Sequence, residues 1–253
     1  MTTAADILQF MESIAPTELK MEWDNVGLLC GRSDKQVRTL LVALDPFLHV
    51  CQEAVEAGAD LLVTHHPLIF QPLSAVSDQT ATGRAIMTLI ANDISAVNAH
   101  TNLDCAEGGV NDTLAQLLGL AEVSVIGSEN LLRAGRYQGS LPEFLDHIKA
   151  MLGCKGLRYV SGGRPVCRVA VGGGSCGSEL ADVVAAGCDT FVTADVKYNQ
   201  FWDAKELGIN LIDAGHFHTE NPVCAVLADK LQKAFPDVQV ILSKKHTDCV
   251  NFY

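Results

Sequence analysis

The sequence lacks the paired cysteines of a metal ribbon. Nine cysteines are spread over 253 residues, and no CxxC pair occurs among them. An odd, widely spaced set argues against both a disulfide framework and a zinc ribbon. Most of them stand among Val, Ala and Leu, where reduced cysteine behaves as a small hydrophobic residue. The cysteines are therefore interpreted mainly as core residues: Cys30, Cys51, Cys105, Cys154, Cys167, Cys176, Cys188, Cys224 and Cys249.

Basic residues are also scarce. The chain has 18 Lys and Arg against 30 Asp and Glu, and its formal net charge is −12. This balance makes broad nucleic-acid binding unexpected, because such binding needs a basic face. A local cationic site is still allowed, since bound metal ions add positive charge that the formal count omits.

Long hydrophobic runs are missing as well. No apolar run reaches the roughly 18 residues of a membrane span, and the N-terminus lacks the pattern of a signal peptide. Hydrophobic residues make up 48% and charged residues 19%, which is typical of a packed globular protein. We therefore expect a cytoplasmic protein with no membrane partner.

The regular elements predict an α/β fold. Residues 4–14 carry apolar side chains at helical spacing, and Pro16 follows them. The run TLLVAL (39–44) is typical of a buried strand, 49–57 of a helix, and 61–64 of a second buried strand. Strand, helix and strand with short connections indicate a parallel βαβ unit.

The two halves of the sequence resemble each other, which predicts an internal duplication. Alignments at a spacing of 129 residues, and at a spacing thirteen residues shorter, match segments in the same order. We therefore expect two similar α/β domains. The matched pairs are LVAL (41–44) with AVGG (170–173), EAGADLLVTHH (56–66) with AAGCDTFVTAD (185–195), and NDISAVNAH (92–100) with LGINLIDAGH (207–216).

The domain boundary is predicted near residue 125. Residues 1–125 would form the first α/β domain and 126–253 the second. Short strands at 135–140 and 157–161 are expected around a helix at 142–152. The C-terminal run VQVILSKKHTDCVNFY is compatible with either half.

Four polar clusters follow predicted strands: THH (64–66), AHTNLD (99–104), VTADVKYN (192–199) and DAGHFHTE (213–220). Sites in parallel sheets form at the carboxyl ends of strands, so all four are expected to face one crevice. An ordinary surface loop is the alternative interpretation of the adjacent histidines His65 and His66. A deep core position is not expected, because four ring nitrogens would need partners there.

These clusters supply a set of metal ligands. Three imidazoles with two carboxylates suit Zn, Mn, Fe, Co or Ni better than Ca, which prefers oxygen alone. Five ligands exceed the four of a closed structural zinc site, which favours two divalent ions about 3.5 to 4 Å apart. Their excess positive charge would favour an anionic ligand. The predicted ligands are His65, His66, Asp104, His216 and Glu220.

Other segments carry weaker signals. The WDN segment (23–25) is typical of a turn with an aromatic anchor, and lining of the site is its alternative role. The glycines at 172–174 lack a phosphate-loop spacing and predict a tight strand-to-helix turn. His218 and His246 are interpreted as solvated histidines.

The motifs MEWDNVGLLCG, LVTHHPLIF, HTNLD and DAGHFHTE together resemble the GTP cyclohydrolase 1 type 2 homologues, also described as the YbgI-like or Nif-three-like dinuclear-metal family. The resemblance covers almost the whole chain. It implies two interlinked α/β domains with the metals between them, the same five ligand positions, His100 lining the site, and a ring-shaped homohexamer. Many members carry TGD followed by a histidine, whereas this chain has Ala194, Asp195 and Asn199, so the role of the 193–199 loop stays open.

The expected activity is that of a dinuclear metal-dependent hydrolase acting on a nucleotide or related anionic substrate. Two ions would lower the pKa of a water, and His100, four residues before Asp104, would transfer a proton as the catalytic residue. The resemblance implies GTP as a substrate, with attack at the guanine imidazole ring and loss of formate; a phosphoester is the other enzymatic candidate. The alternative is a non-catalytic metal-binding oligomeric scaffold or regulatory protein, whose ions stabilise the fold.

Overall fold

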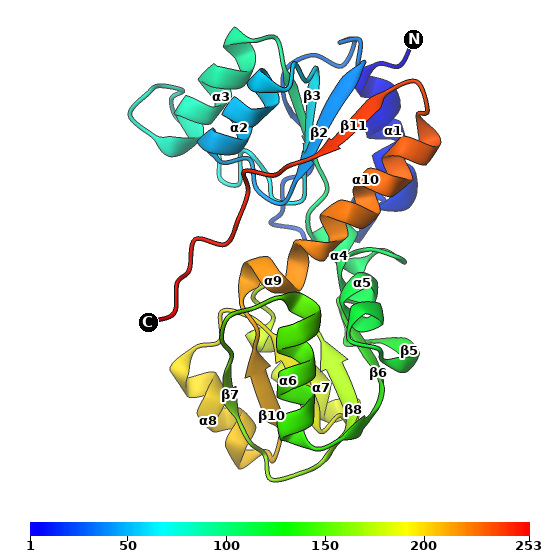
Figure 1. Ribbon diagram of the computed structural model, residues 1–253, viewed down its shortest axis with the longest axis vertical. Helices are drawn as coiled ribbons and strands as arrows, with labels where there is room; N and C mark the ends of the chain where they lie inside the picture. Colours follow the sequence, from blue (N-terminus) through cyan, green and yellow to red (C-terminus); the bar gives the residue numbers. More distant parts are fainter. The chain divides into compact units, whose positions relative to one another are not determined.

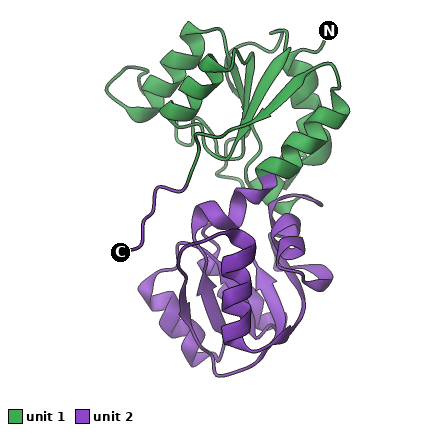
Figure 2. Ribbon diagram, in the orientation of Figure 1, with its two compact units in different colours: residues 1–106, 224–247 green, residues 107–223, 248–253 purple.

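The protein has two α/β units, each built on its own sheet. A computed structural model describes all residues, 1–253 (Figure 1). Unit 1 contains residues 1–106 and 224–247, and unit 2 contains residues 107–223 and 248–253 (Figure 2). The α/β class predicted from the sequence is therefore confirmed. No helix has both the length and the hydropathy needed to cross a membrane.

Unit 1 has a five-stranded sheet in the order β1-β4-β3-β2-β11. Neighbouring strands are parallel from β4 to β11, and β1 is antiparallel to β4. The strands are β1 (Gly27–Cys30), β2 (Thr39–Ala43), β3 (Leu61–Thr64), β4 (Ser95–Asn98) and β11 (Gln239–Leu242). The helices are α1 (Ala4–Ile14), η1 (Thr17–Leu19), α2 (Leu48–Glu56), α3 (Ala81–Ala91), α4 (Thr101–Cys105) and α10 (Pro222–Ala234), which begins in unit 2.

Both faces of the first sheet are covered by helices. Figure 1 shows α2 and α3 on one side of the β2, β3 and β11 strands and α1 and α10 on the other. Leu41 and Leu62 of the strands pack with Ala54 of α2 and Leu89 of α3 in one buried cluster. Because both faces are buried, the central strands β2 and β3 are nearly continuous apolar runs and not alternating ones.

Unit 2 has a six-stranded sheet in the order β5-β6-β8-β9-β10-β7. The strands are β5 (Ala121–Ile126), β6 (Leu132–Gly139), β7 (Arg158–Val160), β8 (Val166–Val171), β9 (Thr190–Thr193) and β10 (Asn210–Asp213). The helices are α5 (Val110–Leu117), α6 (Leu141–Leu152), η2 (Gly177–Glu179), α7 (Leu180–Ala185), α8 (Tyr198–Glu206) and α9 (His216–Glu220).

The central strands β8, β9 and β10 of the second sheet are also largely buried on both faces. Val169 lies in the cluster that contains Phe144 of α6, whereas its neighbour Ala170 lies in the cluster that contains Leu180 of α7. Successive side chains of a strand point to opposite faces, so β8 contributes to two cores at once. Residues that follow the carboxyl ends of β8, β9 and β10 are thereby held on a rigid support.

The central elements of the two units follow one plan. In unit 1, β2, α2, β3, α3 and β4 run in order with parallel pairing, and β8, α7, β9, α8 and β10 do the same in unit 2. This agrees with the duplication expected from the sequence. The flanking strands differ, because β11 is parallel to β2 whereas β6 is antiparallel to β8.

The division into units differs from the boundary predicted near residue 125. That position falls inside β5, whose pairing with β6 makes it part of the second sheet. Unit 2 accordingly starts at Glu107. The C-terminal strand β11 joins the first sheet through β2, which answers a question that the sequence left open.

Candidate metal centre

The adjacent histidines directly follow the buried strand β3. The His66 backbone N–H donates to the Leu44 carbonyl oxygen at 2.9 Å, and the Thr64 hydroxyl donates to the His66 carbonyl oxygen at 2.7 Å. These bonds fix the backbone of the turn at the strand end. His65 is fully buried, which corrects the expectation that neither histidine has a deep position, whereas His66 is partly exposed.

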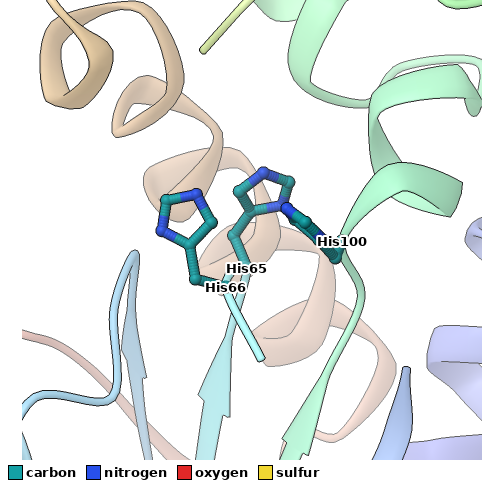
Figure 3. Close-up of side chains that lie close together, drawn as sticks. All are labelled: His65, His66 and His100. Carbon is teal, nitrogen blue, oxygen red and sulfur yellow. The ribbon is translucent and has the colours of Figure 1, made fainter. Parts of the chain in front are cut away.

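Three imidazoles gather at this end of the first sheet (Figure 3). His65 and His66 follow β3, and His100 follows the adjacent strand β4. The ring centroids lie 4.9 Å apart for His65 and His66, 5.2 Å for His65 and His100, and 5.5 Å for His66 and His100. One ring nitrogen from each of the three lies within 4.8 Å of the others. Such a cluster is suited to a divalent ion of borderline softness.

Each of these rings uses its Nδ1 atom to bond an oxygen that can only accept. A ring nitrogen beside such an oxygen must carry the proton, which places the lone pair of the neutral ring on Nε2. Outer partners of this kind orient metal-binding histidines and fix their tautomer. The pairs are His65 with the Ala99 carbonyl at 2.9 Å, His66 with Asp45 Oδ1 at 2.7 Å, and His100 with Asp24 Oδ1 at 2.8 Å.

The two carboxylates that hold these rings remain ionised. Burial raises the pKa of Asp24, but hydrogen bonds from His100 and Thr101 outweigh it and hold the pKa well below its usual range. Burial likewise raises the pKa of Asp45, and bonds from His246 and His66 lower it by more. Ionised carboxylates are the stronger acceptors for imidazole N–H groups.

Asp104 extends the cluster with a carboxylate. It lies on α4, four residues after His100, and is 6% exposed. Its Oδ1 atom is 3.6 Å from His65 Nε2. Because the Nδ1 proton of His65 is held by a backbone carbonyl, a lone pair on Nε2 faces a carboxylate oxygen. A cation stabilises two such electron-rich atoms, so this donor set fits a divalent metal ion.

Unit 2 carries a second set of donors on α9. His216 Nδ1 lies 2.7 Å from Asp195 Oδ2, and His216 Nε2 lies 2.9 Å from Glu220 Oε2. The imidazole thus stands between two carboxylates, an environment that a cation stabilises. Glu220 is 4% exposed, whereas Asp195 lies at the surface. Nitrogen and oxygen donors again fit a borderline divalent ion.

A glycine turn makes room for the Glu220 carboxylate. Gly174 has a φ of +64°, and a Cβ at this position would lie 2.1 Å from Glu220 Oε1. Its N–H donates to the Thr219 hydroxyl at 3.0 Å, which ties the turn to α9. The glycine-rich segment after β8 is therefore the tight turn predicted from the sequence, and it also shapes the surroundings of two predicted ligands.

The Gly174→Ala variant should be destabilised and should hold Glu220 poorly. Positive φ alone costs about 1–2 kcal/mol for a residue with a Cβ, and the collision with Glu220 adds to this. Gly187→Ala is the matched control, because Gly187 has a φ of +70° with no atom within 4 Å of the added carbon. Urea unfolding of both metal-free variants checks the difference; equal losses of unfolding free energy would contradict a role for the contact with Glu220.

The structure distributes the predicted site residues between the two units. Unit 1 holds His65, His66, His100 and Asp104 close together, and unit 2 holds His216 beside Glu220. The sequence left open whether Asp24 lines the site; the structure places it against His100.

Three partners of the predicted site residues were missed, left open or misread. Asp45 received no role from the sequence, although it stands shortly after the end of a buried parallel strand, which is a usable signal. The role of the loop that contains Asp195 was left open, and the structure places Asp195 against His216. The interpretation of His246 as solvated is wrong, because it is buried and its Nε2 lies 3.0 Å from Asp45 Oδ2. His218 is also largely covered, and it bonds the Leu152 carbonyl and Asp248.

Comparison with known proteins gives a consistent result over nearly the whole chain. The family model described as Duf34/NIF3 (NGG1p interacting factor 3) matches residues 2–249. A Clostridium perfringens protein named GTP cyclohydrolase 1 type 2 homolog is 38% identical, with 98% of each chain covered. Among solved structures, a Bacillus cereus protein related to NIF3 superposes with a TM-score of 0.93 at 27% identity, covering 100% of this chain and 99% of the other. The reduced HcgD protein from Methanocaldococcus jannaschii gives 0.84 at 32% identity, covering 96% and 98%.

Proposed function

Because this chain belongs to the Duf34/NIF3 family, we propose that it is a dinuclear metal-dependent hydrolase of small anionic substrates, with nucleotides as the leading class. The proposed metal ligands are His65, His66, Asp104, His216 and Glu220, and the proposed ions are two of Zn, Fe, Mn, Co or Ni. The proposal includes a cytoplasmic location and a closed homo-oligomer, a hexameric ring.

One observation carries the metal assignment. Nδ1 of each clustered histidine is bound to an acceptor, and the same holds for His216 and Asp195. Nε2 of His65 lies 3.6 Å from Asp104 Oδ1, and Nε2 of His216 lies 2.9 Å from Glu220 Oε2, so a ring nitrogen and a carboxylate oxygen converge in each unit. Such pairs of nitrogen and oxygen donors are suited to divalent ions of borderline softness, and the partners of Nδ1 hold the rings in place. When bound, divalent ions would polarise the substrate and make a water more acidic.

His100 is proposed to transfer the proton. Its ring is positioned by Asp24, which also accepts hydrogen bonds from the Thr101 backbone and hydroxyl. The His100 backbone N–H donates to the Asn102 side chain at 2.8 Å. The side chain is 14% exposed, so the ring is held rigidly but remains open to solvent on one side. A residue that exchanges protons with a leaving group needs both properties.

Two exposed aromatic rings beside His100 favour a substrate with a planar ring. Trp23 is 61% exposed and Phe70 is 45% exposed. Their centroids lie 5.8 Å apart, and each lies within 6.2 Å of the His100 ring. A hydrogen bond from the Asn25 side chain to the Ile69 carbonyl, 2.6 Å long, ties the two aromatic segments together. Such a surface can stack a nucleobase while the charged part of the ligand approaches the cations.

We expect Trp23→Ala to weaken nucleotide binding by about 1–3 kcal/mol, the usual contribution of one base-stacking contact. Trp202→Ala is the matched control, because the chain has two tryptophans and Trp202 is also 48% exposed but lies on α8 of unit 2. In a Trp202→Phe background, titration with GTP should quench the fluorescence of Trp23. Equal affinities of the two alanine variants for GTP would count against the stacking surface.

The decisive experiment on the function is a turnover screen combined with metal analysis. The purified protein should contain about two divalent ions per chain, and it should hydrolyse at least one nucleotide in the screen. GTP is the first substrate to test, because the Clostridium perfringens relative is named a GTP cyclohydrolase 1 type 2 homolog. Activity should disappear with a chelator and return with the metal. A protein that holds its metal but turns over no nucleotide or phosphoester would instead favour the scaffold.

The burial of the proposed ligands supports the alternative function, a non-catalytic metal-binding scaffold. His65 is fully buried, and Asp104 and Glu220 are 6% and 4% exposed, so metal held there would stabilise the fold. In that case the thermal stability of the protein would depend on the bound metal, but the protein would hydrolyse no substrate.

A further inference from the structure

The segment after β11 is attached to unit 1 by a buried carboxylate. Glu53 of α2 is 9% exposed and accepts hydrogen bonds from the Ser243 hydroxyl and from the backbone N–H groups of Lys244 and Lys245. Burial raises the pKa of Glu53, but these bonds outweigh it, so the pKa lies below its usual value and the carboxylate stays charged. The chain is therefore fixed immediately before His246.

His246 is in turn held on several sides. Its backbone N–H donates to the Ser243 hydroxyl oxygen at 3.2 Å. Its ring lies parallel to His49, with centroids 6.1 Å apart, and Phe47 lies 6.0 Å away. The side chain is 4% exposed. A ring packed in this way has few alternative rotamers, so the direction of its Nε2 atom is set by the fold.

That nitrogen reaches the carboxylate that orients His66. His246 Nε2 lies 3.0 Å from Asp45 Oδ2, and the other oxygen, Oδ1, lies 2.7 Å from His66 Nδ1. The ionised carboxylate can only accept, so both imidazoles donate to it. With both oxygens engaged, Asp45 cannot rotate without losing a bond.

We propose that His246 is a positioning residue for the metal centre: through Asp45 it fixes the ring orientation and the tautomer of His66. This inference rests on the proposed role of His66 as a metal ligand. It assigns a function to the C-terminal segment of unit 1, which comes from a part of the sequence far from the double-histidine motif. Residues that hydrogen-bond a metal-bound histidine contribute about 10- to 100-fold to metal affinity. His246 does not bond His66 itself but bonds its partner Asp45, so we expect its removal to weaken metal affinity by about tenfold.

The test compares three substitutions of His246 in the full-length protein. His246→Phe keeps a planar ring but removes the donor, and His246→Gln keeps an N–H donor near the position of Nε2. His246→Asn is polar but too short to reach Asp45, and it serves if the Phe variant folds poorly. His49→Phe is the control, because it changes a stacked ring that has no bond to Asp45. Competition of Co²⁺ with a chromophoric chelator gives the affinity, and the visible spectrum of bound Co²⁺ reports the ligand geometry.

We expect the Phe and Asn variants to bind Co²⁺ about tenfold more weakly with an altered spectrum, and the Gln and His49→Phe variants to resemble wild type. If His246→Phe, His246→Asn and His246→Gln all bind Co²⁺ equally weakly, only the packing of the ring matters and the inference is overturned. Wild-type affinity for Co²⁺ in His246→Phe or His246→Asn would also overturn it.

A second measurement separates this inference from the proposed function. In the metal-free protein, ¹⁵N spectra of the histidine rings should show His66 protonated on Nδ1 in wild type and in His246→Gln, and a mixed tautomer in His246→Phe. If wild type binds no Co²⁺ but the tautomers behave as expected, the metal proposal fails while the positioning role stands. If wild type binds Co²⁺ and the tautomer of His66 is the same in all variants, only the positioning role fails.

Discussion

Each of the variants His65→Ala and Glu220→Ala is expected to lose at least one of about two bound ions. His65 supplies an imidazole whose proton is fixed by the Ala99 carbonyl, and Glu220 supplies a buried carboxylate beside His216. Removal of an outer partner alone costs about 10- to 100-fold in metal affinity, so removal of a ligand should cost more. Metal content of the purified protein, measured by plasma emission spectroscopy after gel filtration, checks this.

A matched control is available on the same short helix as a proposed ligand. His218 lies two residues from His216, and its two ring nitrogens bond the Leu152 carbonyl and Asp248. His218→Ala should therefore retain the metal content of wild type. Full retention of both ions in His65→Ala and in Glu220→Ala would refute the ligand assignment, provided that circular dichroism shows both variants folded.

The variant His100→Ala is expected to keep its metal and to lose about 10²- to 10⁴-fold in the rate of hydrolysis, the usual contribution of a general acid or base. The reason is the position of His100, whose ring is held by Asp24 beside the proposed ligands His65 and His66. The rate with a nucleotide substrate and the metal content of the same preparation are the two measurements.

The geometry also allows an alternative role for His100, that of a metal ligand. His100 forms a group of possible ligands with His65 and His66, because one nitrogen of each lies within 4.8 Å of the others. If His100 is a ligand, metal content and rate should fall together in His100→Ala. If neither falls, His100 is a structural histidine and the proton must be transferred by another group.

The sequence was sufficient for the elements whose pattern is local. The helix Ala4–Ile14 and the strand Leu61–Thr64 lie where the helical apolar spacing and the short apolar run predict them. The position of β11 was not accessible in this way, because the partner of a parallel strand is chosen by packing across the whole unit. The boundary was predicted near residue 125, and the sequence pattern does not show that β5, which contains this position, pairs with β6.

The same distinction applies to the site. His65 and Asp104 were accessible because a strand or a short motif precedes them, and the structure brings them within 3.6 Å. The role of Asp45 depends on a contact 21 residues away, and that of His246 depends on the long return of the chain to β2. No local pattern distinguishes His246 from a solvated histidine. The hydrogen bonds that orient the ligands are therefore harder to predict from the sequence than the ligands themselves.

The pairing of β11 with β2 has a consequence for biosynthesis. Gln239 pairs with Thr39, so the first sheet gains its edge strand only after the intervening residues of unit 2 have been made. Until then, β2 has unpaired backbone N–H and C=O groups along one edge. A strand edge of this kind can pair with a strand of another chain. Most of unit 2 lies between these two segments, so on the ribosome it can fold before unit 1 is complete. Closing so long a loop is slow, which makes completion of the first sheet a late step in folding.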